Sequence, residues 1–167
     1  WTIPGCGGGT AEREAAAVAR LRGVAAAEEA ARARALADVD GDGAGEFLSW
    51  KELTGAVPAR RSASGDFSGP RAAAPPAAEA GARLVESGIV DGGAAGGLLL
   101  RVYLPAAGGG AAVEGVGGGP LSAPADADLA ERAWCAYSWP RGGEGPVLFA
   151  GPGGRVLRSE NAGRRYS

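Results

Sequence analysis

The sequence predicts an α+β fold, in which a long N-terminal α-helix packs on a C-terminal antiparallel β-sheet of about four strands. Residues 11–37 are mostly alanine, arginine and glutamate, with a few valines and leucines at helical spacing. Residues 98–158 contain short apolar runs separated by turn residues, which is typical of strands. Glycine and proline contribute 31 and 11 of the 167 residues, and their clusters predict long loops between these elements.

The chain has the length of one domain. We expect residues 1–10 to form a flexible N-terminal arm and residues 11–167 to form that domain. Thr10 is a suitable N-cap for the helix of residues 11–37, and glutamates in the first turn complement the helix dipole. Small apolar residues recur on one side of this helix and predict the stripe that packs on the sheet: Val18, Leu21, Val24, Ala25, Ala31 and Ala35.

An acidic loop at residues 38–46 follows the helix and is the strongest candidate site. Asp38, Asp40, Asp42 and Glu46 supply hard oxygen ligands at positions 1, 3, 5 and 9 of a calcium-binding loop, with a glycine at position 6. Position 12, where such loops carry a bidentate glutamate, is Ser49. The pattern leaves two interpretations open: calcium held by these four carboxylates, or a solvated turn between two helical segments.

The other elements follow from local patterns. Residues 47–53 carry two aromatic residues and two leucines, and predict a short helical turn on the core. An irregular region is expected at 56–78 and a glycine-rich connection at 106–124. Apolar runs and turn signals place the remaining elements: a short helix at 79–87, strands at 98–104 and 132–139, and a hairpin of 147–150 with 155–158.

The composition excludes several kinds of site. Without histidine, the chain has no Ser-His-Asp or Cys-His pair and no histidine metal ligand. The chain has a net charge of -2, and its acidic and basic residues are interspersed. It therefore lacks the basic surface that is typical of a nucleic-acid-binding protein. Asp126, Asp128 and Glu131 form a second acidic group, which a helix N-terminus or a solvated turn explains better than paired catalytic carboxylates. We therefore expect a non-enzymatic protein.

The strand at 132–139 carries aromatic residues and one of the two cysteines. Its alternation divides the residues between two faces: Trp134, Ala136 and Ser138 on one, Ala133, Cys135, Tyr137 and Trp139 on the other. Cys6 and Cys135 permit one disulfide, which would tie the N-terminal arm to the sheet and imply an oxidising compartment. The alternative is a buried thiol at Cys135 and an unpaired one at Cys6.

Several segments match, in order, those of a known family. The chain opens with Ile3-Pro4, continues with AEREAAAVARLRGVAAAEEAARA and then with DVDGDGAGEFLSWKELTG. The later segments are LVESGIVDGG, LLLRVYLP, DADLAERAWCAYSWP and VLFAGPGGRVLRSEN. This order, over roughly residues 3–158, resembles the pilin-like, prepilin-type proteins of planctomycetes and similar GC-rich bacteria, which are related to type IV pilins and type II secretion pseudopilins.

The resemblance implies a pilin-like fold and a non-enzymatic, extracytoplasmic structural subunit that assembles into a filament through its N-terminal helix. Calcium in a loop of some pseudopilins favours the calcium interpretation of Asp38, Asp40, Asp42 and Glu46. The family's hydrophobic anchor and cleavage motif are absent, and residues 6–9 replace continuous helix. Membrane contact is therefore expected only through an upstream anchor. The alternative is an accessory or scaffolding subunit that docks on a larger membrane or envelope complex; both imply protein partners and no nucleic acid.

Overall fold

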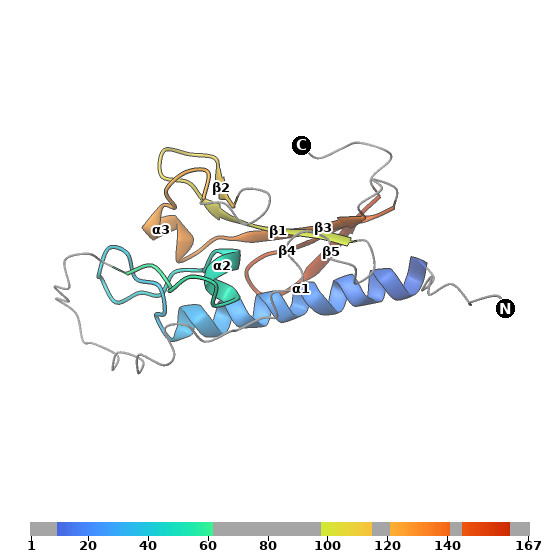
Figure 1. The fold of residues 1–167 in the computed structure, drawn as a ribbon, viewed down its shortest axis with the longest axis horizontal. Coiled ribbons are helices and arrows are strands. Elements are labelled where there is room, and N and C mark those ends of the chain that lie inside the picture. Colours follow the sequence, from blue (N-terminus) through green and yellow to red (C-terminus); the bar gives the residue numbers. More distant parts are fainter. Residues whose placement is uncertain (1–9, 62–97, 115–120, 141–144, 161–167) are drawn as a thin grey trace.

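A helix and an antiparallel sheet form the two layers of the molecule (Figure 1). The structure is a computed structural model, and it describes residues 10–61, 98–114, 121–140 and 145–160. Helix α1 (Thr10–Ala33) has 24 residues, which corresponds to about 36 Å. It lies along one face of a five-stranded sheet whose strand order is β2-β1-β3-β4-β5. The α+β prediction of a helix against a C-terminal antiparallel sheet is therefore confirmed, with five strands where about four were expected.

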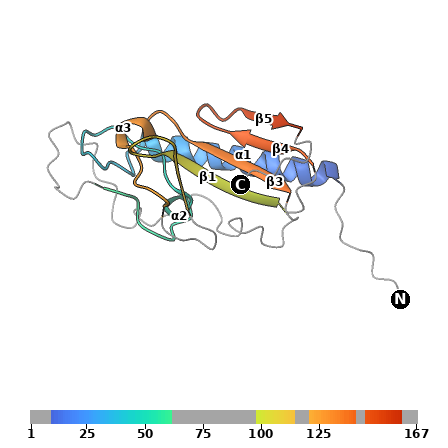
Figure 2. The same ribbon diagram turned by 90° about the horizontal axis from the view of Figure 1, so that it is seen from above.

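The strands pair antiparallel throughout. Their bounds are β1 (Leu98–Pro105), β2 (Ala111–Val113), β3 (Cys135–Pro140), β4 (Val147–Ala150) and β5 (Val156–Ser159). Figure 2, which looks down on the sheet, shows β1, β3, β4 and β5 side by side in front of α1. The additional strand is β2, which lies inside the segment predicted as a glycine-rich connection at 106–124. It pairs with the end of β1 through Leu104 and Ala112, and its length of three residues gave no periodic signal.

The alternation predicted for β3 is confirmed. Trp134, Ala136 and Ser138 are buried, whereas Cys135 and Tyr137 on the opposite face are half-buried. The half-buried face carries a row of rings: Tyr103 meets Tyr137 edge-on at 5.7 Å between centroids, and Tyr137 meets Phe149 at 5.2 Å. The sheet thus has one face in the core and one face of aromatic side chains with partial exposure.

Helix α1 ends four residues earlier than the predicted boundary at residue 37. The amide of Leu36 donates to the carbonyl of Ala31 at 3.1 Å, and the amide of Ala35 donates to the carbonyl of Arg32 at 3.0 Å. These two bonds form a Schellman motif, which ends a helix with one residue in the left-handed conformation. That residue is Ala35, with φ of 45°. Because alanine stands where glycine is usual, no residue type at this position indicated that the helix would end here.

The core lies between α1, the sheet and the segment after the helix. Leu21, Val24 and Ala25 lie on the buried side of α1, as the predicted stripe requires. The segment after the helix adds the buried side chains of Phe47 and Leu48, and it contains the short helix α2 (Trp50–Leu53) at the predicted place. From the sheet come Leu100, Val102, Leu104, Ala136, Leu148 and Ala150.

Polar contacts join the two ends of the described chain. The Arg158 side chain on β5 donates through Nε to Oε1 of Glu14 at 2.8 Å. The amide of Gly153 in the β4–β5 turn donates to Oε1 of Glu29 at 3.3 Å. The last hairpin therefore lies against the first helix. Most of the predicted arm at 1–10, the part of the irregular region 56–78 beyond residue 61, and the predicted helix at 79–87 lie outside the described residues.

Candidate functional site

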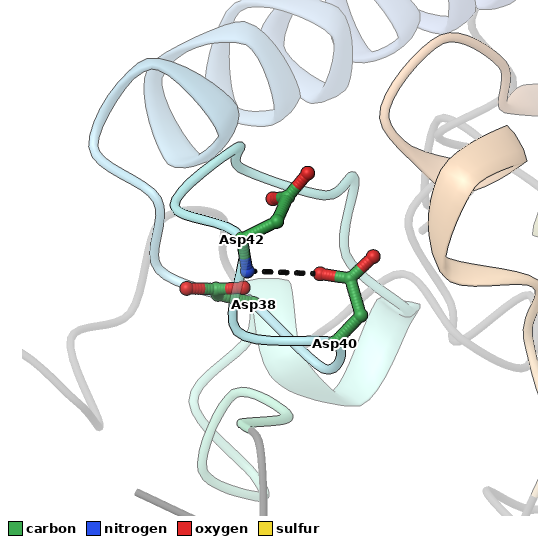
Figure 3. A group of neighbouring side chains, drawn as sticks. All are labelled: Asp38, Asp40 and Asp42. Carbon is green, nitrogen blue, oxygen red and sulfur yellow. Dashed lines mark hydrogen bonds between the residues drawn. The ribbon is translucent and has the colours of Figure 1, made fainter. Parts of the chain in front are cut away.

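The acidic loop brings three of its carboxylates together. An antiparallel bridge between Ala37 and Glu46 closes the loop at its base. Carboxylate oxygens of Asp38, Asp40 and Asp42 lie within 4.8 Å of one another (Figure 3). The sequence predicted this convergence from the alternate spacing of the aspartates. Three carboxylates at this separation repel one another, and a hard divalent cation would relieve the repulsion.

Backbone amides hold each aspartate in place. Oδ1 of Asp38 accepts from Gly41 at 2.8 Å, and Oδ1 of Asp42 accepts from Ala44 at 2.7 Å. Oδ1 of Asp40 accepts from the amide of Asp42 at 3.3 Å, the bond drawn in Figure 3. Asp38 is buried, whereas Asp40 and Asp42 are exposed. These local bonds shape the loop, as is common for aspartates in turns.

Glu46, the fourth predicted ligand, takes part in a different cluster. Its side chain is 1% exposed. Oε1 accepts from the amide of Val39 at 2.5 Å, and Oε2 lies 3.4 Å from Nη1 of Arg60. Burial raises the pKa of Glu46 above its ordinary value. The structure thus groups the three aspartates without Glu46; binding of calcium by this loop stays a prediction.

A second group of carboxylates adjoins the loop from α3 (Ala127–Ala130). Carboxylate oxygens of Asp40, Asp128 and Glu131 lie within 4.8 Å of one another. The helix interpretation of this segment is confirmed, because Asp126 is the N-cap and accepts from the amide of Leu129 at 2.9 Å. Burial, and then the charges of Asp42 and Asp40, raise the pKa of Glu131. The approach of α3 to the loop was not predicted, because these residues are far apart in the sequence.

A buried network of charged groups lies behind the loop. Glu52 on α2 accepts through Oε1 from the amide and Nε of Arg60, at 2.7 and 3.0 Å. Its Oε2 accepts from the amide of Ser49 at 2.7 Å, which completes a capping box for α2. Arg60 also donates through Nη2 to the carbonyl of Phe47 at 2.7 Å. Arg60 thus connects the chain around position 60 to Phe47 and Glu52, which lie at or near the two ends of the 47–53 segment.

Glu28 is the acidic residue within the helical stripe. Its exposure is 0%, and its Oε2 accepts from the amide of Leu48 at 2.8 Å. The sequence analysis missed this residue, although it lies four positions after Val24 and seven after Leu21 on the same helical face. That spacing was the signal available for a buried glutamate.

The remaining candidate residues separate in space. Trp134 packs in the core, with its ring centroid 5.9 Å from that of Phe47, as expected for a core aromatic. Cys135 is half-buried, and burial raises the pKa of its thiol. Cys6, its proposed partner, lies outside the described residues, so the disulfide stays a prediction. The described residues of this region thus offer acidic groups and packing contacts.

Comparisons with known proteins return no match among family models, curated proteins or solved structures. Within the described part of the chain, no helix combines the length and the apolar character that a membrane crossing requires.

Proposed function

We propose that this chain is a pilin-like, non-enzymatic structural subunit that acts outside the cytoplasm and assembles through helix α1. The observation that carries the proposal is the arrangement of α1, which lies along one face of a single antiparallel sheet and has its other side toward solvent. A 24-residue helix in this position is suited to pack against the helix of another subunit.

The composition of the exposed side of α1 supports the proposal. Ala19, Gly23, Ala26 and Ala30 are exposed and recur at intervals of three and four residues. A Cβ atom added at Gly23 would meet nothing within 4 Å, so this part of the helix surface is open. The distance between two packed helices depends on the side chains at their contact, and small residues favour a close approach. The absence of histidine from the chain is in keeping with a structural role.

Site-specific photo-crosslinking in cells that produce the full protein tests the proposal. A benzophenone amino acid replaces Ala26 on the exposed side of α1, and the matched control replaces Ala107, an exposed alanine after β1. We expect light to give a ladder of multiples of the chain mass from position 26 and none from position 107. A single adduct of one other fixed mass would favour the accessory-subunit alternative. Equal labelling from both positions, or no adduct from position 26, would contradict assembly through α1.

A further inference from the structure

Glu28 connects helix α1 to the segment that follows it. The side chain is completely buried, and Oε2 accepts from the amide of Leu48, which lies 20 residues away in the chain. Oε1 is also buried, and no residue in the described part of the chain donates a hydrogen bond to it. An ionised carboxylate in this position has one oxygen without compensation, whereas a protonated carboxyl group carries no charge into the interior.

Arg60, whose charge acts on Glu28, is already shared by two other carboxylates. Arg60 pairs with Glu52 at 3.0 Å and with Glu46 at 3.4 Å, and it donates to the carbonyl of Phe47. Glu28, Glu46 and Glu52 are all buried, so full ionisation would place three negative charges around one guanidinium group. Burial of charge is unfavourable unless each charge is paired. The arrangement thus favours a proton on one of the three carboxyl groups.

The surroundings of Glu28 make it the carboxyl group that keeps the proton. Burial raises the pKa of Glu28 well above its ordinary value. The charges of Glu52 on α2 and Glu29 on α1 act in the same direction. The Leu48 amide and Arg60 oppose the shift without cancelling it.

We infer that the contact between α1 and residues 46–61 is a pH-sensitive clasp, closed while the Glu28 carboxyl group holds its proton and loosened when Glu28 ionises. The clasp holds Leu48, α2 and the Arg60 segment against the helix. Ionisation adds an unpaired charge beside Glu52, and separation of the segment from α1 exposes both carboxylates to water. The inference concerns the fold of the single chain and stands independently of the proposed assembly.

The direction of the pH effect follows from linkage. The open form releases the proton near the ordinary value of 4.5, whereas the closed form keeps it to a higher pH. Stability of the clasp is therefore fully present below 4.5 and is lost as pH rises through the folded-state pKa. Within that interval the ratio of open to closed forms increases about tenfold for each pH unit.

Hydrogen exchange at the Leu48 amide tests the clasp. The protection factor, corrected for the intrinsic pH dependence of exchange, is measured from pH 4 to pH 8 on the wild-type protein. The variant Glu28→Gln is neutral at every pH and keeps an acceptor for Leu48, and the matched control Glu29→Gln removes a neighbouring, more exposed charge. Between pH 4.5 and the folded-state pKa of Glu28, we expect protection to fall about tenfold per pH unit in wild type and in Glu29→Gln, and to stay level in Glu28→Gln.

Two results would overturn the inference: level protection in the wild-type protein, or an unchanged pH dependence in Glu28→Gln. If Glu28→Gln does not fold, the carbon-13 resonance of the Glu28 carboxyl group in the wild-type protein decides the question. We expect its titration midpoint well above the ordinary range. A midpoint at the ordinary value of 4.5 would show that Glu28 is ionised in the closed form.

Discussion

Gly45 lies against the C-terminal end of helix α1, so closely that a Cβ atom at position 45 would overlap the carbonyl oxygen of Arg32 and lie 2.9 Å from the Cα of Ala35. Both obstacles are backbone, which cannot rotate away as a side chain can. The contact fixes where the acidic loop returns to the helix. It lies next to the bridge between Ala37 and Glu46, which closes the loop that carries the three aspartates.

Gly45→Ala is expected to lower the free energy of unfolding by about 2–3 kcal/mol, because the added methyl group must displace the end of the helix. The matched control is Gly23→Ala, where a Cβ atom meets nothing within 4 Å. That control should raise the free energy of unfolding by up to about 1 kcal/mol, because alanine favours the helix. Urea denaturation of both variants measures the difference. Equal stability of the two variants would contradict the close contact at Gly45.

Ala35→Gly is expected to stabilise the protein, because Ala35 has a φ of 45° at the position where a Schellman motif favours glycine. The left-handed conformation costs alanine about 1 kcal/mol, and part of this gain is lost to the greater freedom of glycine in the unfolded chain. A net gain of about 0.5 kcal/mol should appear as a higher urea midpoint with an unchanged slope. A lower midpoint would mean that the methyl group of Ala35 contributes packing that outweighs the strain.

Arg60→Gln is expected to destabilise the protein by about 2–3 kcal/mol at neutral pH, below the range for a fully buried pair because the arginine side chain is 22% exposed. The loss should be smaller at pH 5 than at pH 8, since burial raises the pKa of both Glu28 and Glu46 and protonated carboxyl groups need no cation. Arg158→Gln, which removes an exposed pair with Glu14, should change stability by less than about 1 kcal/mol. A pH-independent loss in Arg60→Gln would contradict the charge argument.

Calcium is expected to raise the melting temperature if Asp38, Asp40 and Asp42 bind it, because a ligand that binds only the folded state stabilises it. The gain is about 2.7 kcal/mol at a hundredfold excess over the dissociation constant. Thermal melts with calcium and with chelator measure the effect. Asp40→Asn should abolish it, whereas Glu46→Gln should retain it, since the Glu46 carboxylate contacts Val39 and Arg60. Identical melts of the wild-type protein under both conditions would leave the loop as a solvated turn.

The sequence predicted the elements that have their own periodicity. The apolar stripe of α1 and the alternation of Trp134, Ala136 and Ser138 depend on local spacing, and both agree with the structure. The convergence of the three aspartates was predicted for the same reason. Strand β2 is three residues long, and alanine takes the place of a C-terminal glycine in α1, so neither produced a pattern.

The features of the site that were not predicted depend on contacts between segments that are distant in the sequence. Asp128 approaches Asp40 only because α3 lies beside the loop, a relation that no local pattern contains. Glu28 lay at the spacing of the buried stripe, but a charged residue on a helix is usually exposed. Its burial depends on the amide of Leu48 and on the segment that covers it. Such sites are defined by tertiary packing.

The bond between Glu14 and Arg158 spans 144 positions in the sequence. The hairpin of β4 and β5 packs on a helix that begins at Thr10, so the two-layer core is complete only when the last strand is present. During synthesis from the N-terminus, the apolar side of α1 stays uncovered until the strands of the sheet have been made. Contacts of such long range slow folding, because the loop-closure entropy is lost before the contacts form. We therefore expect truncation before β4 to leave α1 with an uncovered apolar face and the nascent chain dependent on chaperones.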